Sequence, residues 1–406
     1  MVFAFAFPFF AQIGKHGLQK GLRQRVLEGF IVHSAGSLLR YYILYDYYSG
    51  GDAGRYYRWG LQYAARIWHL DFSFLLNTGF GWGTQNTMFI TGFMLSAIGP
   101  TKRGGFFVFA LLAFLGLYLM LRAFQRNYPD SSAMKYATWL FFWPSLWFWP
   151  ASIGKDALVL LATCMVVYGY CGAARISLMP MVAGLGLAGF LRPHVAGVLV
   201  VSIAVAHWFS PGKKRGKGHY LQGFLIMILL FFVVREGFSK LGVGNVDFDN
   251  VKEFVDSVSH RTSQGGSNIS TPGFTLLGIP MAFVNILFRP FLWEAGNIMM
   301  VASALEMTLF WLVFWKRRRT IAAVAVRWRE TRLMRLAIPL TLLYTLMLGL
   351  AFGNLGIIAR QRIHVMPFLL LWLAVEPRRI VQTVPKAPGP AVSRPFLKVP
   401  AMLNRS

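Results

Sequence analysis

The sequence predicts an all-α, polytopic integral membrane protein of about ten transmembrane helices, with interfacial and re-entrant helices between them. Of its 406 residues, 56% are hydrophobic, and the mean hydropathy is +0.50. The apolar residues form long runs nearly free of charge, and about 20 such residues span a bilayer. The clearest runs are Phe106–Leu121, Ala157–Ala174, Val195–Phe209, Tyr220–Val234, Ala295–Trp315 and Leu336–Phe352.

The positions of the basic residues predict how these segments are oriented. The chain has 41 Lys and Arg against 15 Asp and Glu, which gives a formal net charge of +26. Cytoplasmic loops of membrane proteins carry an excess of Lys and Arg, so we place the densest basic stretches in the cytoplasm. These stretches are Lys15–Arg25, Lys213–Lys217, Lys316–Arg335 and Arg378–Arg379. Because the basic residues punctuate apolar segments, we expect membrane lipids and phosphate groups as partners, and no nucleic acid.

The first apolar segment, about Val26–Tyr45, leaves the cytoplasm, so the loop that follows lies outside. We place this first outer loop at residues 46–85. Within it, Tyr56–Leu70 alternates aromatic, apolar and basic residues, a pattern typical of an interfacial helix that lies on the membrane.

The number of spans before the second basic stretch is ambiguous. Five apolar runs lie in this part of the chain, whereas a cytoplasmic Lys102-Arg103 pair would require an even number of crossings. One run therefore does not cross completely, and the candidates are Met88–Ile98 and the Trp-rich Trp139–Trp149.

The second half of the chain contains one long polar stretch, which predicts an outer loop at residues 235–275. Leu276–Phe288 then fits a re-entrant helix that ends at Arg289-Pro290. Residues 1–380 thus form a single transmembrane helical domain. The Pro-rich segment 381–406 has no core pattern, and we expect a disordered cytoplasmic tail.

The two cysteines predict neither a disulfide nor a metal site. Cys164 and Cys171 are seven residues apart on an apolar helical run, and two turns of helix separate them by about 10 Å, too far for a disulfide. The sequence contains no metal-binding motif, no nucleotide-binding loop and no nucleophile elbow. We therefore expect no metal and no cofactor.

Asp52 is the candidate catalytic residue. It lies in Gly51-Asp52-Ala53-Gly54-Arg55-Tyr56-Tyr57, between the first span and the interfacial helix. An ionisable group near the hydrocarbon region is costly, about 2.5–3.5 kcal/mol on insertion scales, so it usually marks a site or a paired contact. The first reading makes Asp52 a general base, and the second pairs it with Arg55 or Arg58 at the membrane surface.

Lys155 is a candidate phosphate-binding residue. Ser152 can cap a helix that starts near Gly154, and Asp156 is well placed in the first turn of that helix. Lys155 has no such explanation, because a cation at a helix N-terminus is unfavourable unless an anion is nearby. A helix N-terminus with a lysine suits phosphate. The rings of Trp143–Trp149 suit either sugar stacking or an aromatic membrane belt.

Three groups of basic residues complete the candidate site. Each lies beside a Pro or Gly break at the outer end of an apolar run, where helix ends can face a ligand. Arginine binds phosphate through two parallel hydrogen bonds and stays charged. Convergence of the three groups on the outer leaflet would hold a lipid pyrophosphate, whereas single arginines at a membrane interface commonly snorkel to water. The groups are Arg192 with His194, Arg289, and Arg360 with Arg362 and His364.

Two features resemble known families. The acid followed by paired tyrosines, Asp52 to Tyr57, resembles the acidic first-loop motif of membrane glycosyltransferases with the GT-C fold. This resemblance implies a GT-C-like fold, a loop acid that acts on the acceptor, and a sugar donor carried on a polyprenyl phosphate. The segment Gly353–Arg362 and the Arg-Pro breaks resemble elements of bacterial polysaccharide-assembly membrane proteins. Such proteins use arginines and a histidine on undecaprenyl-pyrophosphate donors in the bacterial cytoplasmic membrane.

We therefore expect a membrane glycosyltransferase that uses a polyprenyl-linked sugar donor and a glycan or lipid acceptor on the outer face of the cytoplasmic membrane. The alternatives are an oligosaccharide polymerase or ligase acting on pyrophosphate donors, and a non-enzymatic transporter of lipid-linked oligosaccharides. A transporter would use the same arginines without chemistry, although the chain lacks the internal repeat common in transporters. A structural partner in an envelope complex is the third reading.

Overall fold

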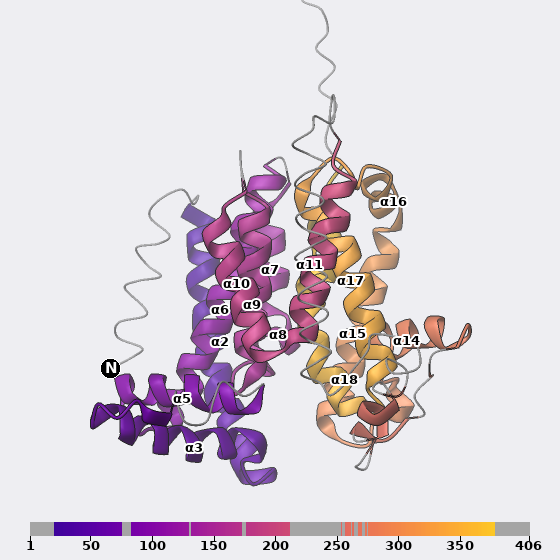
Figure 1. The fold of residues 1–406 in the computed structure, drawn as a ribbon. Helices are drawn as coiled ribbons and strands as arrows, with labels where there is room; N and C mark the ends of the chain where they lie inside the picture. The colour runs from indigo at the N-terminus through magenta and orange to yellow at the C-terminus, as the bar shows by residue number, and fades with distance from the viewer. Residues whose placement is uncertain are drawn as a thin grey trace, which may run out of the picture.

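The computed structural model describes residues 20–74, 83–129, 131–172, 176–211 and 275–377, with short pieces between residues 253 and 273. The described residues form helices and no strand, and one isolated bridge pairs Asn268 with Asn354. Figure 1 shows long helices side by side in a bundle, with two helices lying across one end of it. The prediction of an all-α fold is confirmed.

The first half of the bundle contains α2 (Lys20–Tyr47), α3 (Gly51–Trp68), α5 (Thr84–Ile98), α6 (Lys102–Asn127), α7 (Ala133–Phe142), α8 (Pro144–Phe148), α9 (Lys155–Tyr170) and α10 (Leu178–Leu191). The second half contains α11 (Pro193–Trp208), α14 (Gly278–Leu287), η1 (Leu292–Glu294), α15 (Ile298–Lys316), α16 (Arg318–Val326), α17 (Arg332–Ala351), α18 (Leu355–Gln361), η2 (Arg362–His364) and α19 (Met366–Ala374).

Three of the described helices are long and apolar enough to cross a membrane, namely α6, α15 and α17. The pair formed by 355–364 and 366–374 is bent by 59° and adds a fourth if it is one broken span. The helices α10, α11 and α14 are apolar but shorter. These observations agree with a membrane protein, while the total of about ten spans remains a prediction.

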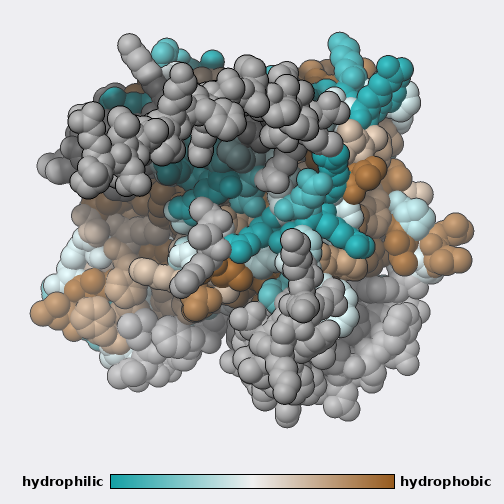
Figure 2. Space-filling view, turned by 90° about the horizontal axis from the view of Figure 1, so that it is seen from above, coloured by the Kyte–Doolittle hydropathy of each residue, from teal (hydrophilic) through white to brown (hydrophobic). Residues whose placement is uncertain are grey.

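At one end of the bundle, which we call the basic end, Glu376 links the two halves of the bundle. The Glu376 carboxylate accepts hydrogen bonds from Lys135 Nζ at 3.1 Å and from Arg317 Nη2 at 3.0 Å. Partial burial alone would raise the pKa of Glu376, but these two cations outweigh it and lower the pKa. Figure 2, which looks onto this end, shows hydrophilic residues across its centre and hydrophobic residues on the flanks.

The opposite end of the bundle is covered by α3 and α5 (Figure 1). The two helices pack closely, because a Cβ atom at Gly92 would lie only 2.5 Å from Tyr63 Cβ. At their C-terminal ends, Trp68 Nε1 donates to Ser96 O at 2.9 Å. The α3 helix exposes Arg58 and Arg66 and buries small and aromatic residues, which is the amphipathic pattern predicted for Tyr56–Leu70.

The arrangement of α5 and α6 bears on the ambiguous run Met88–Ile98 and on the Lys102-Arg103 pair. The Met88–Ile98 run belongs to α5, which lies beside α3, and α6 begins directly after it. Lys102 and Arg103 lie over the rings of Tyr45 and Tyr41, at the C-terminal end of α2. Lys102 and Arg103 therefore lie at the end of the bundle that α3 and α5 cover, away from the basic end. The Trp-rich run is divided between α7 and α8 at Trp143.

The predicted re-entrant helix corresponds to α14. It ends at Leu287, shortly before the cis peptide bond between Arg289 and Pro290. The α14 helix packs against the bundle at two places. Trp311 Nε1 donates to Leu287 O at 2.8 Å. Gly349 of α17 lies so close to α14 that an added Cβ atom would be 2.3 Å from Ala282 O. That α14 crosses only part of the membrane remains a prediction.

Most of the predicted outer loop 235–275 and the whole tail 381–406 lie outside the described residues. The described pieces of the loop contact the turn between α17 and α18. Ile269 N donates to Gly353 O at 2.9 Å, and Thr262 Oγ1 donates to Ala351 O at 3.2 Å.

The two-ended arrangement predicts a labelling pattern. The native Cys164 and Cys171 are fully buried, so single cysteines at exposed positions can be labelled without background. In spheroplasts, a membrane-impermeant maleimide is expected to label Gln62→Cys on α3 and to reach Arg319→Cys on α16 only after permeabilisation. The reverse pattern would place the basic end outside and contradict the orientation.

Candidate functional site

The N-termini of three helices lie close together at the end of the bundle that α3 covers. Their N-cap residues are Gly83 for α5, Gly154 for α9 and Arg192 for α11, and none of the three caps supplies a side-chain hydrogen bond. Gly83 has φ +63° and packs so closely that an added Cβ atom would lie 3.1 Å from Lys155 Nζ and 3.2 Å from Leu191 O. The first N–H groups of a helix lack intrahelical partners and carry partial positive charge. This convergence is therefore suited to an anion.

Lys155 lies at this convergence. Its Nζ atom donates to Thr84 Oγ1 at 2.9 Å, which links the first residue of α9 to the first residue of α5. A second link joins α5 to α10, since Asn86 Nδ2 donates to Phe190 O at 2.6 Å. The ammonium group of Lys155 thus lies beside the start of α5, and its predicted role in phosphate binding stays a prediction.

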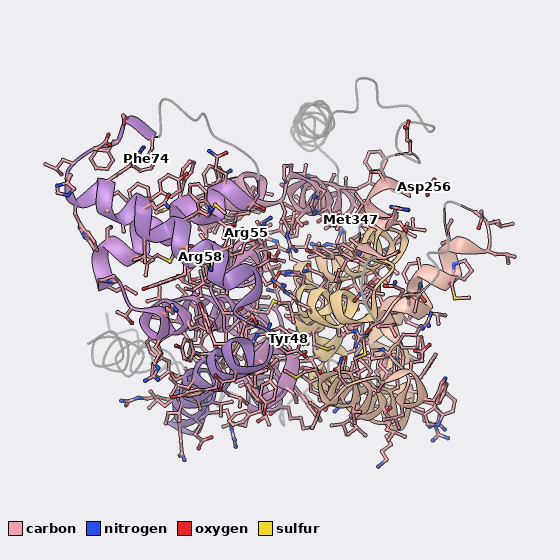
Figure 3. All side chains as sticks on the ribbon, turned by 90° about the horizontal axis from the view of Figure 1, so that it is seen from below. Tyr48, Arg55, Arg58, Phe74, Asp256 and Met347 are labelled. Atoms are coloured by element: carbon pink, nitrogen blue, oxygen red, sulfur yellow. The ribbon has the colours of Figure 1, made fainter. Side chains whose placement is uncertain are left out.

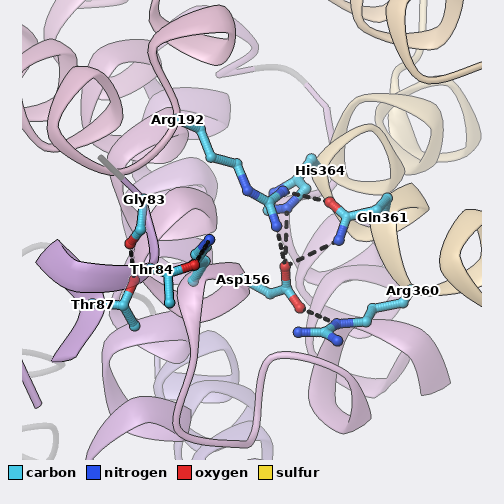
Figure 4. Close-up of polar contacts among 9 residues, drawn as sticks. Gly83, Thr84, Thr87, Asp156, Arg192, Arg360, Gln361 and His364 are labelled. Atoms are coloured by element: carbon cyan, nitrogen blue, oxygen red, sulfur yellow. Dashed lines mark hydrogen bonds and ion pairs between the residues drawn. The ribbon is translucent and has the colours of Figure 1, made fainter. Parts of the chain in front are cut away.

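Asp156 is the centre of the polar network (Figure 4). Its side chain is 3% exposed and accepts hydrogen bonds from Arg192 Nη2 at 3.0 Å, from Gln361 Nε2 at 3.3 Å and from Arg360 Nε. The imidazole Nε2 of His364 lies 3.9 Å from Asp156 Oδ1, beyond hydrogen-bonding distance. A single buried carboxylate thus joins α9, the α10–α11 junction and α18.

The sequence analysis explained Asp156 as a favourable residue at a helix start and did not include it among the candidate site residues. The available signal was an acid next to a long apolar run, because such an acid needs a cationic partner once it is buried. The expected capping by Ser152 is not found, since the N-cap is Gly154 and has no side-chain hydrogen bond.

Arg40 on α2 is the second residue that the sequence did not single out. It is 6% exposed, and its guanidinium lies over the rings of Phe148 and Trp149, 4.8 Å from each centroid. It also lies within electrostatic range of Arg360 and Asp156. The rings of this Trp-rich segment therefore contact an arginine and one another, with Phe148 and Trp149 5.2 Å apart.

Positive charge exceeds negative charge in this network. Arg40, Lys155, Arg192 and Arg360 contribute four cations, and Asp156 contributes the one buried carboxylate. The described residues of the network thus carry an excess of three positive charges, and the three helix N-termini add to it.

Asp52 lies at the rim of the network. Ser49, Gly50 and Gly51 all have positive φ values and turn the chain from α2 into α3, whose first turn carries Asp52. Arg55 Nη2 donates to Asp52 Oδ1 at 2.8 Å, and both side chains are 50% exposed. This is the surface pair that one reading of the sequence expected. Asp52 is also within electrostatic range of Lys155 and Arg360.

Tyr56 connects Asp52 with the network. It is buried, and burial together with the Asp52 carboxylate raises the pKa of Tyr56. Figure 3, which looks onto this end, shows Arg55 and Arg58 on α3 with Tyr48 in the first half of the bundle and Met347 in the second. Because its pKa is raised, the Tyr56 hydroxyl stays neutral near pH 7, and it lies on the inner, buried side of α3.

The remaining predicted residues divide between two places. His194 is exposed in the first turn of α11, within electrostatic range of Arg192 and Lys155. Arg289 and Arg362 do not join the Asp156 network. Arg289 Nε donates to Glu294 Oε2 at 3.1 Å, and a second bond joins the same two side chains. Arg362 is 1% exposed and donates to Ile286 O at 2.7 Å and to the carbonyl of Arg289.

Arg289 and Arg362 thus hold the break after α14. Partial burial opposes ionisation of Glu294, but hydrogen bonds from Arg289 and from Phe291 N–H outweigh it and lower the pKa of Glu294. In the described part of the chain these two arginines have protein partners for their guanidinium groups, which suits a structural role at the break after α14. The expected convergence of all the arginines is therefore limited to Arg192 and Arg360.

The described residues hold no group of three or more His, Cys, Asp or Glu side chains that could bind a metal ion. No family model, no curated protein and no solved structure matches this chain. The chemistry of the site must therefore be argued from its own residues. These residues form a cluster of cations and helix N-termini whose charge suits an anion, with a carboxylate at its rim.

Asp156→Asn is expected to destabilise the protein strongly. The substitution removes the counter-charge of two buried or half-buried arginines, and breaking a buried pair in this way costs about 3–5 kcal/mol. The measurement is the thermal unfolding midpoint in detergent, with Asp52→Asn as the control, because an exposed pair contributes about 0–1 kcal/mol. Equal midpoints for the two variants would contradict the central role of Asp156.

Proposed function

We propose that this protein is a membrane glycosyltransferase that takes a sugar from a polyprenyl-phosphate-linked donor at the outer face of the bacterial cytoplasmic membrane. It would pass the sugar to a glycan or lipid acceptor in the assembly of a cell-envelope polysaccharide. The observation that carries this proposal is the excess of cations at the convergence of three helix N-termini, in a bundle with apolar helices.

In this proposal the donor phosphate binds at the cluster of cations and helix N-termini. Lys155, Arg192 and Arg360 lie around Asp156 and the helix ends, so they can bind the phosphate and neutralise the charge that develops on it. His194, at the start of α11, borders the same place. The lipid chain of the donor would lie along the apolar helices, outside the polar network.

The transfer step is a substitution at the anomeric carbon. Asp52 takes the proton of the acceptor hydroxyl, and the acceptor oxygen forms the new bond to the anomeric carbon. The bond between that carbon and the donor phosphate oxygen breaks, and the electron pair leaves with the lipid phosphate. The half-exposed position of Asp52 leaves it open to an acceptor that approaches from the surface.

The second candidate is an oligosaccharide polymerase or ligase that uses a pyrophosphate donor. It is favoured by the size of the charge excess, which is larger than one phosphodiester needs. A transporter of lipid-linked oligosaccharides would use the same cations but would not need Asp52.

Asp52→Asn is expected to slow sugar transfer by about 10²–10⁴-fold while the protein still folds, because the nearly isosteric amide cannot accept the proton. The assay is transfer of a labelled sugar from a polyprenyl-phosphate or -pyrophosphate donor in proteoliposomes.

Asp71→Asn is the matched control for this assay. Asp71 is also an acid of the α3 region, it lies 3.9 Å from Arg66, and it lies at the far end of the helix. Near-normal transfer by Asp52→Asn would remove Asp52 from the reaction. Movement of the donor across the bilayer without transfer, in the unmodified protein, would favour the transporter.

A further inference from the structure

We propose that the acceptor of the transferred sugar is an acidic glycan, and that an exposed patch of cations beside Asp52 recognises it. We call these cations the rim patch, which consists of Arg55 and Arg58 of α3 and Lys102 and Arg103 of α6. The inference rests on the proposed function, because it names the class of acceptor whose proton Asp52 would take. The rim patch is separate from the Asp156 network that would hold the donor.

Tyr45 of α2 brings Arg58 and Lys102 together. Lys102 Nζ lies 4.9 Å from the centre of the Tyr45 ring and 5.8 Å from that of Tyr57. Arg58 approaches the same tyrosine, because a Cβ atom added at Gly54 would lie 3.7 Å from Arg58 Nη1 and 3.9 Å from Tyr45 Oη. Cations from α3 and α6 therefore share one surface.

Arg103 and Arg55 extend this surface. The Arg103 guanidinium lies 5.4 Å from the centre of the Tyr41 ring, beside Lys102 in the chain. Arg55 lies one turn before Arg58 on α3, and residues three positions apart share a helix face. Its Nη2 atom donates to Asp52 Oδ1 at 2.8 Å, so the rim patch reaches the proposed general base.

The rim patch carries more positive charge than its protein partners balance. Asp52 pairs with Arg55, whereas Arg58, Lys102 and Arg103 have no ion-pair partner among the described residues. The α6 helix also begins at Lys102, and its first turn contains no acidic residue. Two cations at the positive end of a helix dipole are unfavourable, and contacts with tyrosine rings offset this only in part. A negatively charged partner would supply the missing counter-charge.

The position of the rim patch favours the acceptor over a membrane lipid as this partner. As the general base, Asp52 needs the acceptor hydroxyl within hydrogen-bonding distance. Asp52 and Arg55 are both 50% exposed, and the exposed ring of Trp59 lies one turn after Arg55. Figure 3 shows Arg55 and Arg58 nearer the middle of this end than Phe74, which lies near its edge. A glycan that approaches from water therefore meets the rim patch and Asp52 together.

An acidic group on the acceptor would also act on the pair formed by Asp52 and Arg55. A carboxylate or phosphate beside Arg55 competes with Asp52 for the guanidinium, because both supply anionic oxygens as hydrogen-bond acceptors. Asp52 can then accept the proton of the hydroxyl, while the acidic group of the acceptor stays charged and paired with Arg55. The acceptor thus helps to prepare the base with which it reacts.

The test measures the binding of short glycans to the full chain in phosphatidylcholine nanodiscs. The probes are tetragalacturonate, phosphorylated maltotetraose and neutral maltotetraose, which have the same number of sugar rings. An acidic probe is expected to bind about tenfold more tightly than maltotetraose, and the two acidic probes distinguish carboxylate from phosphate as the recognised group. This preference is expected to shrink as the salt concentration rises, because exposed charges are screened.

Arg58→Gln/Lys102→Gln removes two cations of the rim patch and leaves the ion pair of Asp52 in place. This double variant is expected to bind the acidic probe about fivefold more weakly, because two exposed ion contacts are lost, and to bind maltotetraose nearly unchanged. Arg66→Gln/Arg319→Gln is the matched control, since it lowers the net charge equally at exposed positions outside the rim patch. Exposed substitutions of this kind are expected to leave the fold intact.

Equal binding of acidic and neutral probes, no binding of any probe, or an equal loss in the control variant would overturn the inference. A thermal unfolding midpoint that phosphatidylglycerol raises only when the rim patch is intact, without selective glycan binding, would assign the patch to lipid head groups instead. Either result with sugar transfer retained would leave the glycosyltransferase proposal standing. Selective binding of acidic glycans without any sugar transfer would support the glycan surface and contradict the proposed function.

Discussion

The buried carboxylate of Asp156 is the interaction on which this end of the bundle depends. It lies at the start of α9 in the first half of the chain, and its partners come from the α10–α11 junction and from α18. Arg192 also donates to Gln361, so the network closes on itself. An uncompensated charge at this depth would be strongly unfavourable, and therefore Asp156 and its cations hold these helix ends together.

The same network leaves positive charge available for a ligand. Asp156 balances one of the four cations, while Arg192 and Arg360 keep 15% and 30% of their side-chain area exposed. The N-termini of α5, α9 and α11 lie close together, and none has a side-chain cap. The site therefore combines a rigid framework, set by Asp156, with an electrostatic preference for anions, set by the surplus cations.

Most of the described helices could be predicted from the sequence, because each depends on a local pattern of apolar and polar residues. The apolar runs near Phe106, Ala295 and Leu336 correspond to α6, α15 and α17, and the amphipathic segment after Asp52 corresponds to α3. The Lys102-Arg103 pair left the number of crossings open, because the sequence alone does not reveal that its charges lie over the tyrosines of α2.

The candidate site could be predicted from the sequence only in part, because it depends on contacts between segments that are far apart in the chain. Lys155, Arg192 and Arg360 lie beside helix breaks, which is a local signal. Arg289 lies beside a similar break, yet its guanidinium pairs with Glu294 five residues away. Arg40 lies in the middle of a helix without any break, so its approach to Asp156 and Arg360 follows from helix packing alone.

A double-mutant cycle between Asp156 and Arg192 tests the account most directly. The free energy of unfolding is measured for the unmodified protein, Asp156→Asn, Arg192→Gln and the double variant. If the Asp156 network holds the helix ends together, the double variant is less destabilised than the sum of the single variants, with a coupling of about 0.5–3 kcal/mol. Additive effects would show that the two side chains act independently and would contradict the account.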